Sequence, residues 1–395
     1  MINILKNKNN MIKVSLVTST RAEYGLLKNF IQNLSKSKKF KLQLIVTGTH
    51  LEKEFGNSII EIKKDGFKNL KKLKYLIGDD SPLSIAKSIG DGIYKFCKIF
   101  KKNKSDMLII LGDRYELISS CYAATLLKIP ICHFQGGEQT HGVMDDVIRN
   151  SVTKLSHIHF AATKKYKDRI IQMGENPKYV FNIGGLGCEN IKKYKRSSLR
   201  LLEKKYNIEV SNSFCVATFH PETLSKIEIK NQIKPMLQAL QKINNLKIIF
   251  TYPNADIGYK KIISEIKHFV NKDKNNRFLV KSFGSDFYSI LSYCDFVIGN
   301  SSTGILEFPS FKKPTVNIGL RQGGREKSLS IIDCKNNLKS ICIGIKKARS
   351  KKFLLKIKNV KNPYDNGNTS IKSLKILENM DYKNILKKKF YDLKT

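Results

Sequence analysis

One apolar run in the first half of the chain limits the folds that the sequence can adopt. Residues 107–111 read Met-Leu-Ile-Ile-Leu, and Gly112-Asp113-Arg114 follow directly. A strand with no polar face has to be buried on both sides, which is typical of a central strand in a parallel sheet covered by helices. The run therefore predicts an open α/β fold, with Asp113 at the carboxyl end of a strand.

The same order of apolar run, polar end and helical pattern recurs along the chain. The expected strands of the first half span 13–18, 42–47, 106–112, 129–134, 157–161 and 179–183. Those of the second half span 214–219, 247–252, 278–281, 295–299 and 315–318. Strands that alternate with helices favour βαβ units and parallel sheets. We therefore expect two Rossmann-like, doubly wound domains facing a cleft.

The length of the chain also favours two domains, because 395 residues exceed what one compact core usually holds. Gly184-Gly185-Leu186-Gly187 indicates a hinge between them. We expect an N-terminal domain over 11–185 and a C-terminal, nucleotide-binding domain over 186–364. A helical tail, about 365–395, is expected to pack back on the first domain.

Composition bears mainly on partners and location. The net charge of +39 suggests a polyanion partner, but lysine is spread along the whole chain and no nucleic-acid-binding motif accompanies it. We interpret the charge as lysine on solvated faces and expect no specific nucleic-acid partner. No apolar run is long enough to span a bilayer and residues 1–10 lack a signal-like apolar core, so we expect a cytoplasmic protein that does not enter membranes. The eight cysteines form no C-x-x-C pair, which favours reduced thiols and no metal site.

The stretch Gly299–Glu307 is the first candidate binding site. It follows an apolar run and opens a short helical pattern, so backbone N–H groups and the Ser301 and Ser302 hydroxyls are available to an anion such as phosphate. Glu307 lies about one helical turn after Ser302, within reach of a ribose diol beside a diphosphate. A serine-capped helix without a ligand is the alternative interpretation.

Ionisable residues follow several of the other expected strands. Open α/β sheets bind ligands at the carboxyl ends of their strands, and acid/base chemistry needs titratable groups there. Each candidate also has an ordinary structural explanation: a helix N-cap for Asp113 and Asp145, a surface carboxylate for Glu138, and a satisfied loop histidine for His220. The candidates for catalysis are Asp113, Glu138, Asp145 and His220, and Arg21 follows the first strand.

A series of short motifs resembles the hydrolysing UDP-N-acetylglucosamine 2-epimerases, which belong to the nucleotide-sugar 2-epimerase family of sialic acid and related biosynthesis. The resemblance runs in order from about residue 13 to 333. The motifs are Arg21-Ala-Glu-Tyr24, Gly112-Asp-Arg114, Gly136-Gly-Glu138, Asp145-Asp-x-x-Arg149 with Thr153-Lys154, His220-Pro221, Pro253-Asn-x-Asp256, Gly299-Asn-Ser-Ser302, Glu307 and Arg321-Gln-x-Gly-Arg325.

The resemblance implies a GT-B-like fold, no redox cofactor and a homodimer or homotetramer. The sequence itself has no constellation of metal ligands, so we expect no metal. It implies a reaction in which UDP is eliminated from the sugar to give a 2-acetamidoglucal, and water then adds to release N-acetylmannosamine. Asp113 and Asp145 match the family's catalytic carboxylates, and His220 matches a histidine near the phosphates. The remaining matches are nucleotide-binding positions: Arg21, Arg114, Asn254, Ser301, Ser302, Glu307 and Arg321. Gln135 departs from the pattern, because several members carry a catalytic glutamate there.

Three alternatives remain open. The sugar of the UDP-sugar substrate is either N-acetylglucosamine or a 2,4-diacetamido-2,4,6-trideoxy relative used for legionaminic acid. A GT-B glycosyltransferase would share the fold and the nucleotide site. A polyanion-binding protein without catalysis would exploit the positive charge.

Overall fold

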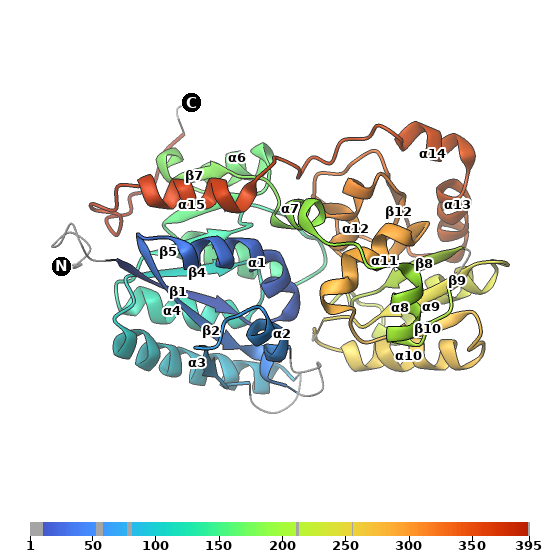
Figure 1. Cartoon of the computed structure of the whole chain (residues 1–395), viewed down its shortest axis with the longest axis horizontal. Helices are drawn as coiled ribbons and strands as arrows, with labels where there is room; N and C mark the ends of the chain where they lie inside the picture. The colour runs from blue at the N-terminus through green and yellow to red at the C-terminus, as the bar shows by residue number, and fades with distance from the viewer. Residues whose placement is uncertain (1–10, 53–57, 77–80, 211–212, 255, 394–395) are drawn as a thin grey trace. The chain divides into compact units, whose positions relative to one another are not determined.

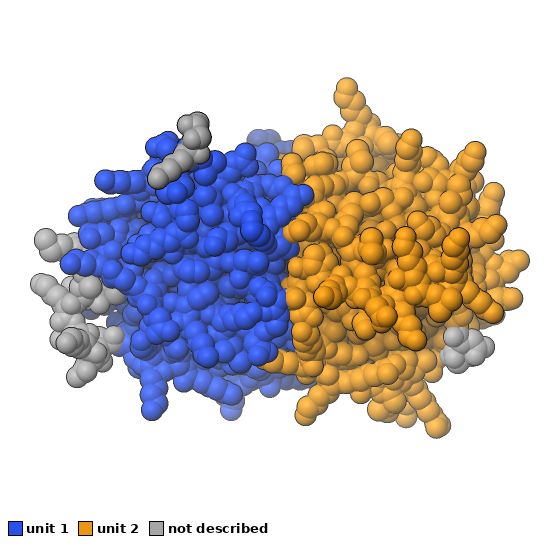
Figure 2. All heavy atoms as spheres, turned by 90° about the horizontal axis from the view of Figure 1, so that it is seen from above, with its two compact units in different colours: residues 1–138, 145–189, 366–395 blue, residues 139–144, 190–365 orange. Residues whose placement is uncertain are grey.

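The computed structural model describes residues 11–52, 58–76, 81–210, 213–254 and 256–393. Residues 1–10, Ala255 of the Pro253–Asp256 motif and the last two residues of the predicted tail lie outside this part of the chain. The chain forms two compact units (Figure 2). Unit 1 holds residues 1–138, 145–189 and 366–395, and unit 2 holds residues 139–144 and 190–365. The segment 139–144, which the sequence assigns to the first domain, therefore belongs to unit 2.

Unit 1 is built on a parallel sheet with the strand order β3-β2-β1-β4-β5-β6-β7. This order, 3-2-1-4-5-6 with one added strand, is that of a Rossmann fold. The strands are β1 Ile12–Thr18, β2 Phe40–Thr47, β3 Lys71–Leu73, β4 Met107–Leu111, β5 Ile131–Phe134, β6 Ile158–Ala161 and β7 Val180–Asn182.

Helices cover both faces of this sheet, so its central strands β4 and β5 are buried on both sides (Figure 1). The helices of unit 1 are α1 Arg21–Lys36, α2 Ile59–Lys64, α3 Pro82–Asn103, α4 Glu116–Leu126, α5 Asp145–Leu155, α6 Lys164–Gln172 and α15 Thr369–Asn379, and α7 Leu186–Lys193 runs on into unit 2. One apolar core lies under α1, α2 and α15, and a second lies under α3, α4 and α5.

Unit 2 repeats the plan with the strand order β10-β9-β8-β11-β12-β13, again parallel throughout. Counted from β8, this is once more the 3-2-1-4-5-6 order. The strands are β8 Phe214–Thr218, β9 Lys247–Thr251, β10 Arg277–Val280, β11 Phe296–Gly299, β12 Thr315–Ile318 and β13 Ile331–Cys334. The helices are α8 Leu199–Tyr206, α9 Ile229–Gln241, α10 Tyr259–Asn271, α11 Phe287–Tyr293, α12 Thr303–Leu306, α13 Leu338–Ala348 and α14 Lys351–Ile357.

The C-terminal segment returns to unit 1 (Figure 1). Helix α15 packs against α1, where the Asn33 side chain donates to the Ser370 hydroxyl at 3.0 Å. Further along, the Lys388 ammonium pairs with Glu175 at 2.7 Å. Burial alone would raise the pKa of Glu175, but His159, Lys154 and Lys388 outweigh burial and lower it to about 2. The tail is therefore held by an ionised, mostly buried carboxylate.

Both sheets have a switch point, the place where the order of strands reverses direction. It lies between β1 and β4 in unit 1 and between β8 and β11 in unit 2. In open α/β sheets, ligands bind beyond the carboxyl ends of the strands at such points. No helix in the described ranges is long and apolar enough to cross a membrane.

Candidate functional site

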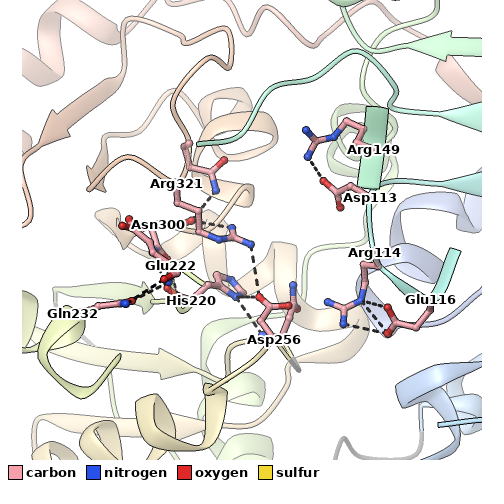
Figure 3. A network of polar contacts seen from close by, with 12 residues as sticks. Asp113, Arg114, Glu116, Arg149, His220, Glu222, Gln232, Asp256, Asn300 and Arg321 are labelled. Atoms are coloured by element: carbon pink, nitrogen blue, oxygen red, sulfur yellow. Dashed lines mark hydrogen bonds and ion pairs between the residues drawn. The ribbon is translucent and has the colours of Figure 1, made fainter. Parts of the chain in front are cut away.

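Asp113 lies at the switch point of unit 1, two residues after β4. Helix α4 begins only at Glu116, and its N-cap is Tyr115, so Asp113 is not the N-cap of that helix. Its carboxylate instead forms an ion pair with the guanidinium of Arg149, a side chain that is 1% exposed (Figure 3). The structure thus ties the end of β4 to α5.

The other two candidate carboxylates of unit 1, Asp145 and Glu138, lie on segments that also contact Arg149. Helix α5 begins at Asp145, and the next residue, Asp146, pairs with Arg149 at 3.0 Å. Glu138 follows β5 and is 2% exposed, so it is not a surface carboxylate. Its backbone carbonyl accepts a hydrogen bond from Arg149 at 3.1 Å. Arg149 therefore contacts the segments that carry all three predicted carboxylates.

Gln135 has a left-handed backbone with a φ of 64° at the end of β5. This conformation is uncommon for residues other than glycine and asparagine, and it is often found at functional sites. The backbone N–H of Gln135 still donates to Phe160 on β6 at 2.9 Å. The residue that departs from the family pattern therefore holds an unusual backbone position between two strands.

Arg21 and Arg114 also lie at the switch point of unit 1, after β1 and β4. Arg21 is the first residue of α1, and the preceding Thr20 caps that helix. The Arg114 guanidinium pairs with Glu116 at 3.1 Å, and the Glu116 side chain is 1% exposed (Figure 3). A guanidinium held by a buried carboxylate is fixed in direction.

Glu23 is a second buried carboxyl group at this switch point. Its carboxyl group accepts a hydrogen bond from the Ser19 backbone N–H at 2.7 Å and completes a capping box with Thr20. Burial raises the pKa of the Glu23 carboxyl to about 7, and the Glu116 carboxylate adds to the rise. Part of the Glu23 population is therefore protonated near neutral pH.

We expect the Glu23 carboxyl to make the protein less stable as the pH rises from 4.5 to 7. In this window the unfolded chain releases the proton that the folded chain keeps, so the free energy of unfolding falls, by about 3 kcal/mol in all. Glu23→Gln should remove this slope while keeping the capping box. Urea denaturation at a series of pH values measures it, with the exposed Glu209→Gln as control. An unchanged slope in Glu23→Gln would show that Glu23 titrates normally.

His220 lies at the switch point of unit 2, two residues after β8. It is 5% exposed and is bound to Asn300 by two backbone contacts: its N–H donates to the Asn300 side chain at 2.6 Å, and its carbonyl accepts from that side chain at 2.9 Å. The backbone N–H of Asn254 donates to Nδ1 of His220 at 3.2 Å. A neutral ring therefore carries its proton on Nε2.

Arg321 contacts Asn300 as well, and also Asp256. One of its terminal nitrogens donates to the Asn300 carbonyl at 3.3 Å, and another lies 3.8 Å from the Asp256 carboxylate. Asp256 is also 3.8 Å from Nδ1 of His220 (Figure 3). Asn300 is fully buried, and it contacts His220 through its side-chain amide and Arg321 through its backbone carbonyl. Asn254 contributes its backbone here, and its side chain is exposed.

The Gly299–Glu307 stretch follows β11, on the other side of the same switch point. Ser301 and Ser302 are partly exposed, and Glu307 is 5% exposed. Helix α12 spans only Thr303–Leu306, a single turn. The short helix expected here is therefore one turn long, and it aligns few peptide dipoles. Donors to an anion at this point have to be backbone N–H groups, hydroxyls and Arg321.

Sequence reasoning missed three residues that organise the site. Arg149, Glu23 and Asn300 each entered only as part of a motif, without a role of their own. The Thr20-x-x-Glu23 spacing is a capping-box signal that would have marked Glu23. Asn300 gave no such signal, because its two contacts with His220 join residues that are far apart in the chain. The described residues contain no cluster of three or more His, Cys, Asp or Glu side chains that could hold a metal ion.

Comparison with known proteins identifies the family. A model of the UDP-N-acetylglucosamine 2-epimerase family matches residues 32–378. The polysialic acid biosynthesis protein P7 of Escherichia coli is 37% identical over 97% of this chain and 98% of that protein. The GDP/UDP-N,N'-diacetylbacillosamine 2-epimerase (hydrolyzing) of Campylobacter jejuni is 39% identical over 86% of this chain and 88% of that protein.

A solved structure shares the fold. The UDP-GlcNAc 2-epimerase from Neisseria meningitidis, bound to UDP-GlcNAc, aligns with a TM-score of 0.77 and 18% identity, over 93% of this chain and 100% of that one. The likeness confirms the prediction of two Rossmann-like domains of the GT-B-like kind. Because the family match covers most of the chain, the chain belongs to the UDP-N-acetylglucosamine 2-epimerase family and is an enzyme of this kind.

Proposed function

We propose that this enzyme converts UDP-N-acetylglucosamine and water into UDP and N-acetylmannosamine, for the biosynthesis of sialic acid-type sugars. The observation that supports this most is the position of the candidate residues. Arg21 and Asp113 follow β1 and β4, while His220 and Ser301 follow β8 and β11. Each sheet thus carries its candidates at its own switch point, where such folds bind ligands.

The proposed reaction is an elimination followed by a hydration. A base removes the proton on C2 of the sugar, the electron pair forms the C1–C2 double bond, and UDP leaves with the electrons of the C1–O bond. Water then gives its hydroxyl to C1, and a proton is delivered to C2 on the opposite face. The products are UDP and the free sugar with inverted configuration at C2.

We assign the proton transfers to unit 1 and most of the binding of UDP to unit 2. Asp113, Asp145 and Glu138 are the carboxyl groups for general acid and base catalysis. His220 and Arg321 are the donors for the diphosphate, whose charge increases as UDP leaves, and His220 also lies among the candidates for catalysis. Further UDP contacts are assigned to Arg21, Arg114, Asn254, Ser301, Ser302 and Glu307.

A second candidate substrate is UDP-2,4-diacetamido-2,4,6-trideoxyglucose, the precursor type for legionaminic acid. The observation that favours it is the 39% identity to a relative named for N,N'-diacetylbacillosamine. Both substrates carry the acetamido group next to the proton that is removed, so the same residues serve both reactions.

Incubation with each UDP-sugar, followed by mass spectrometry of the products, tests this proposal. We expect UDP and a free 2-epimerised sugar from at least one substrate without added nicotinamide. A glycosidic product that forms only with an acceptor would favour a GT-B glycosyltransferase instead. Release of neither UDP nor free sugar from either substrate would contradict the proposal.

We also propose that the enzyme is a cytoplasmic homodimer or homotetramer, as the resemblance to the family implies. Light scattering of the purified protein at assay concentration tests the assembly, and a monomer that retains full activity would contradict it.

A further inference from the structure

Arg149 is the feature of unit 1 that the proposed chemistry leaves unexplained. Among the residues that the structure describes, Arg149 is the largest fully buried side chain, with 1% of its surface exposed. Burying a guanidinium is costly unless charges and hydrogen-bond acceptors surround it. The identity of its partners therefore indicates what the side chain is for.

The partners of Arg149 come from three separate segments. One terminal nitrogen pairs with the Asp113 carboxylate after β4 (Figure 3). The other terminal nitrogen pairs with Asp146 in the first turn of α5 at 3.0 Å and donates to the Glu138 carbonyl after β5 at 3.1 Å. These segments carry the three candidate carboxylates, because Asp145 directly precedes Asp146.

A second set of contacts involves the backbone of Arg149. The Thr153 hydroxyl donates to the Arg149 carbonyl at 2.8 Å and lies 3.3 Å from Nδ1 of His133. Nε2 of His133 lies 2.7 Å from the carbonyl of Gly112, the residue before Asp113. The contacts form a closed ring through α5, β5 and the end of β4. The ring fixes the backbone of Arg149 on α5. Two carboxylates and the Glu138 carbonyl hold its guanidinium, so the side chain has little freedom to reorient.

The geometry points to Arg149 as a positioning residue that fixes Asp113 for proton transfer and holds the Glu138 and Asp145 segments at the same place. The inference rests on the proposed function, since it needs Asp113 to exchange a proton with the sugar. A nearby arginine offers a contrast: Arg169 donates only to the Gly137 carbonyl in the contacts described, at 2.6 Å, and thus supports the same loop without pairing with Asp113.

The positive charge of Arg149 lies directly beside the Asp113 carboxylate. The ionisable groups near Asp113 are Arg149 and Asp146 on α5, His133 on β5, Arg114 beside it in the chain and Glu138 in the following loop. Burial lowers the pKa of His133 to about 4, so this ring is neutral at pH 7. Because an adjacent cation favours a carboxylate, removing the guanidinium should move the titration of Asp113 to higher pH.

The test is the pH profile of kcat/KM for Arg149→Gln, Arg149→Lys and the control Arg169→Gln, with the UDP-sugar that the wild type turns over. For Arg149→Gln we expect kcat/KM to fall by about 10- to 100-fold. The part of the pH profile that reflects the titration of Asp113, its Asp113 limb, should move upward by about one pH unit or more. Whether Asp113 acts as base or acid, its limb moves in the same direction. Arg149→Lys keeps the charge, so its limb should stay in place while kcat falls because lysine cannot bridge the same partners. Arg169→Gln should leave the limb unchanged.

A double-mutant cycle separates positioning from general stability. If Arg149 acts through Asp113, adding Arg149→Gln to Asp113→Asn should lower kcat by less than about 3-fold. Multiplicative losses, or an unshifted limb in a folded Arg149→Gln protein, would overturn the inference. If Arg149→Gln does not fold, Arg149→Lys decides: a kcat lowered with unchanged affinity for UDP supports the inference, and a wild-type kcat overturns it. A wild type that turns over neither UDP-sugar contradicts the proposed function rather than the role of Arg149.

Discussion

Asp113→Asn is expected to lower kcat by at least ~10²-fold, the usual scale for losing a general acid or base. An amide keeps the shape of the carboxyl group but neither accepts nor releases a proton near pH 7. The side chain follows β4 at the switch point of unit 1 and is held there by Arg149. Steady-state release of UDP measures the effect, and circular dichroism checks that the variant is folded.

Matched variants give this prediction its controls. Asp145→Asn should lower kcat on the same scale, because Asp145 is the other carboxylate that matches the family pattern. Gln135→Ala should cost less than either, since an amide at this place can only orient a substrate. A folded Asp113→Asn protein with normal turnover, or a series in which Gln135→Ala loses the most activity, would show that these roles are misassigned.

Gly299→Ala is expected to destabilise unit 2 by about 3 kcal/mol or more, with a loss of UDP binding. Gly299 ends β11 with a φ of 130°, which side chains rarely allow, and an added Cβ would lie 1.9 Å from the Thr218 carbonyl of β8. The two strands that meet at the switch point would have to separate. Ser301 and Ser302 follow Gly299 within three residues, so their loop would move with the end of β11.

Thermal unfolding and UDP titration measure this effect. The control is Gly25→Ala in α1, where the added methyl group meets nothing within 4 Å. Alanine should raise the stability there by about 0.5–1 kcal/mol, because glycine is a poor helix former. A Gly299→Ala protein with normal melting temperature and normal UDP affinity would contradict the view that close approach of β8 and β11 builds the site.

Most of the fold can be predicted from the sequence because most of its strands are buried on both faces. Continuous apolar runs such as Met107–Leu111 and Phe296–Gly299 have no other stable place than the centre of a helix-covered sheet. The two strands that we missed, β3 and β13, lie at sheet edges. Lys71-Lys72 in β3 and the exposed Asp333 in β13 interrupt the apolar pattern, because an edge strand needs less burial.

The site is less predictable, because its key contacts join residues far apart in the chain. The sequence places Asp113 and His220 at strand ends, since periodicity and strand position are local properties. It gives no sign that Asn300 binds the backbone of His220, or that Arg149 bridges the segments of Asp113 and Glu138. Such contacts depend on the order of strands in each sheet, which local patterns do not contain.

Turnover in heavy water tests the central claim most directly. If the enzyme removes the C2 proton and later delivers a solvent proton to the opposite face, the free sugar formed in D₂O should carry one deuterium at C2, by mass spectrometry and NMR. UDP should form in equal amount. A product that retains protium at C2 would contradict elimination and hydration at this site.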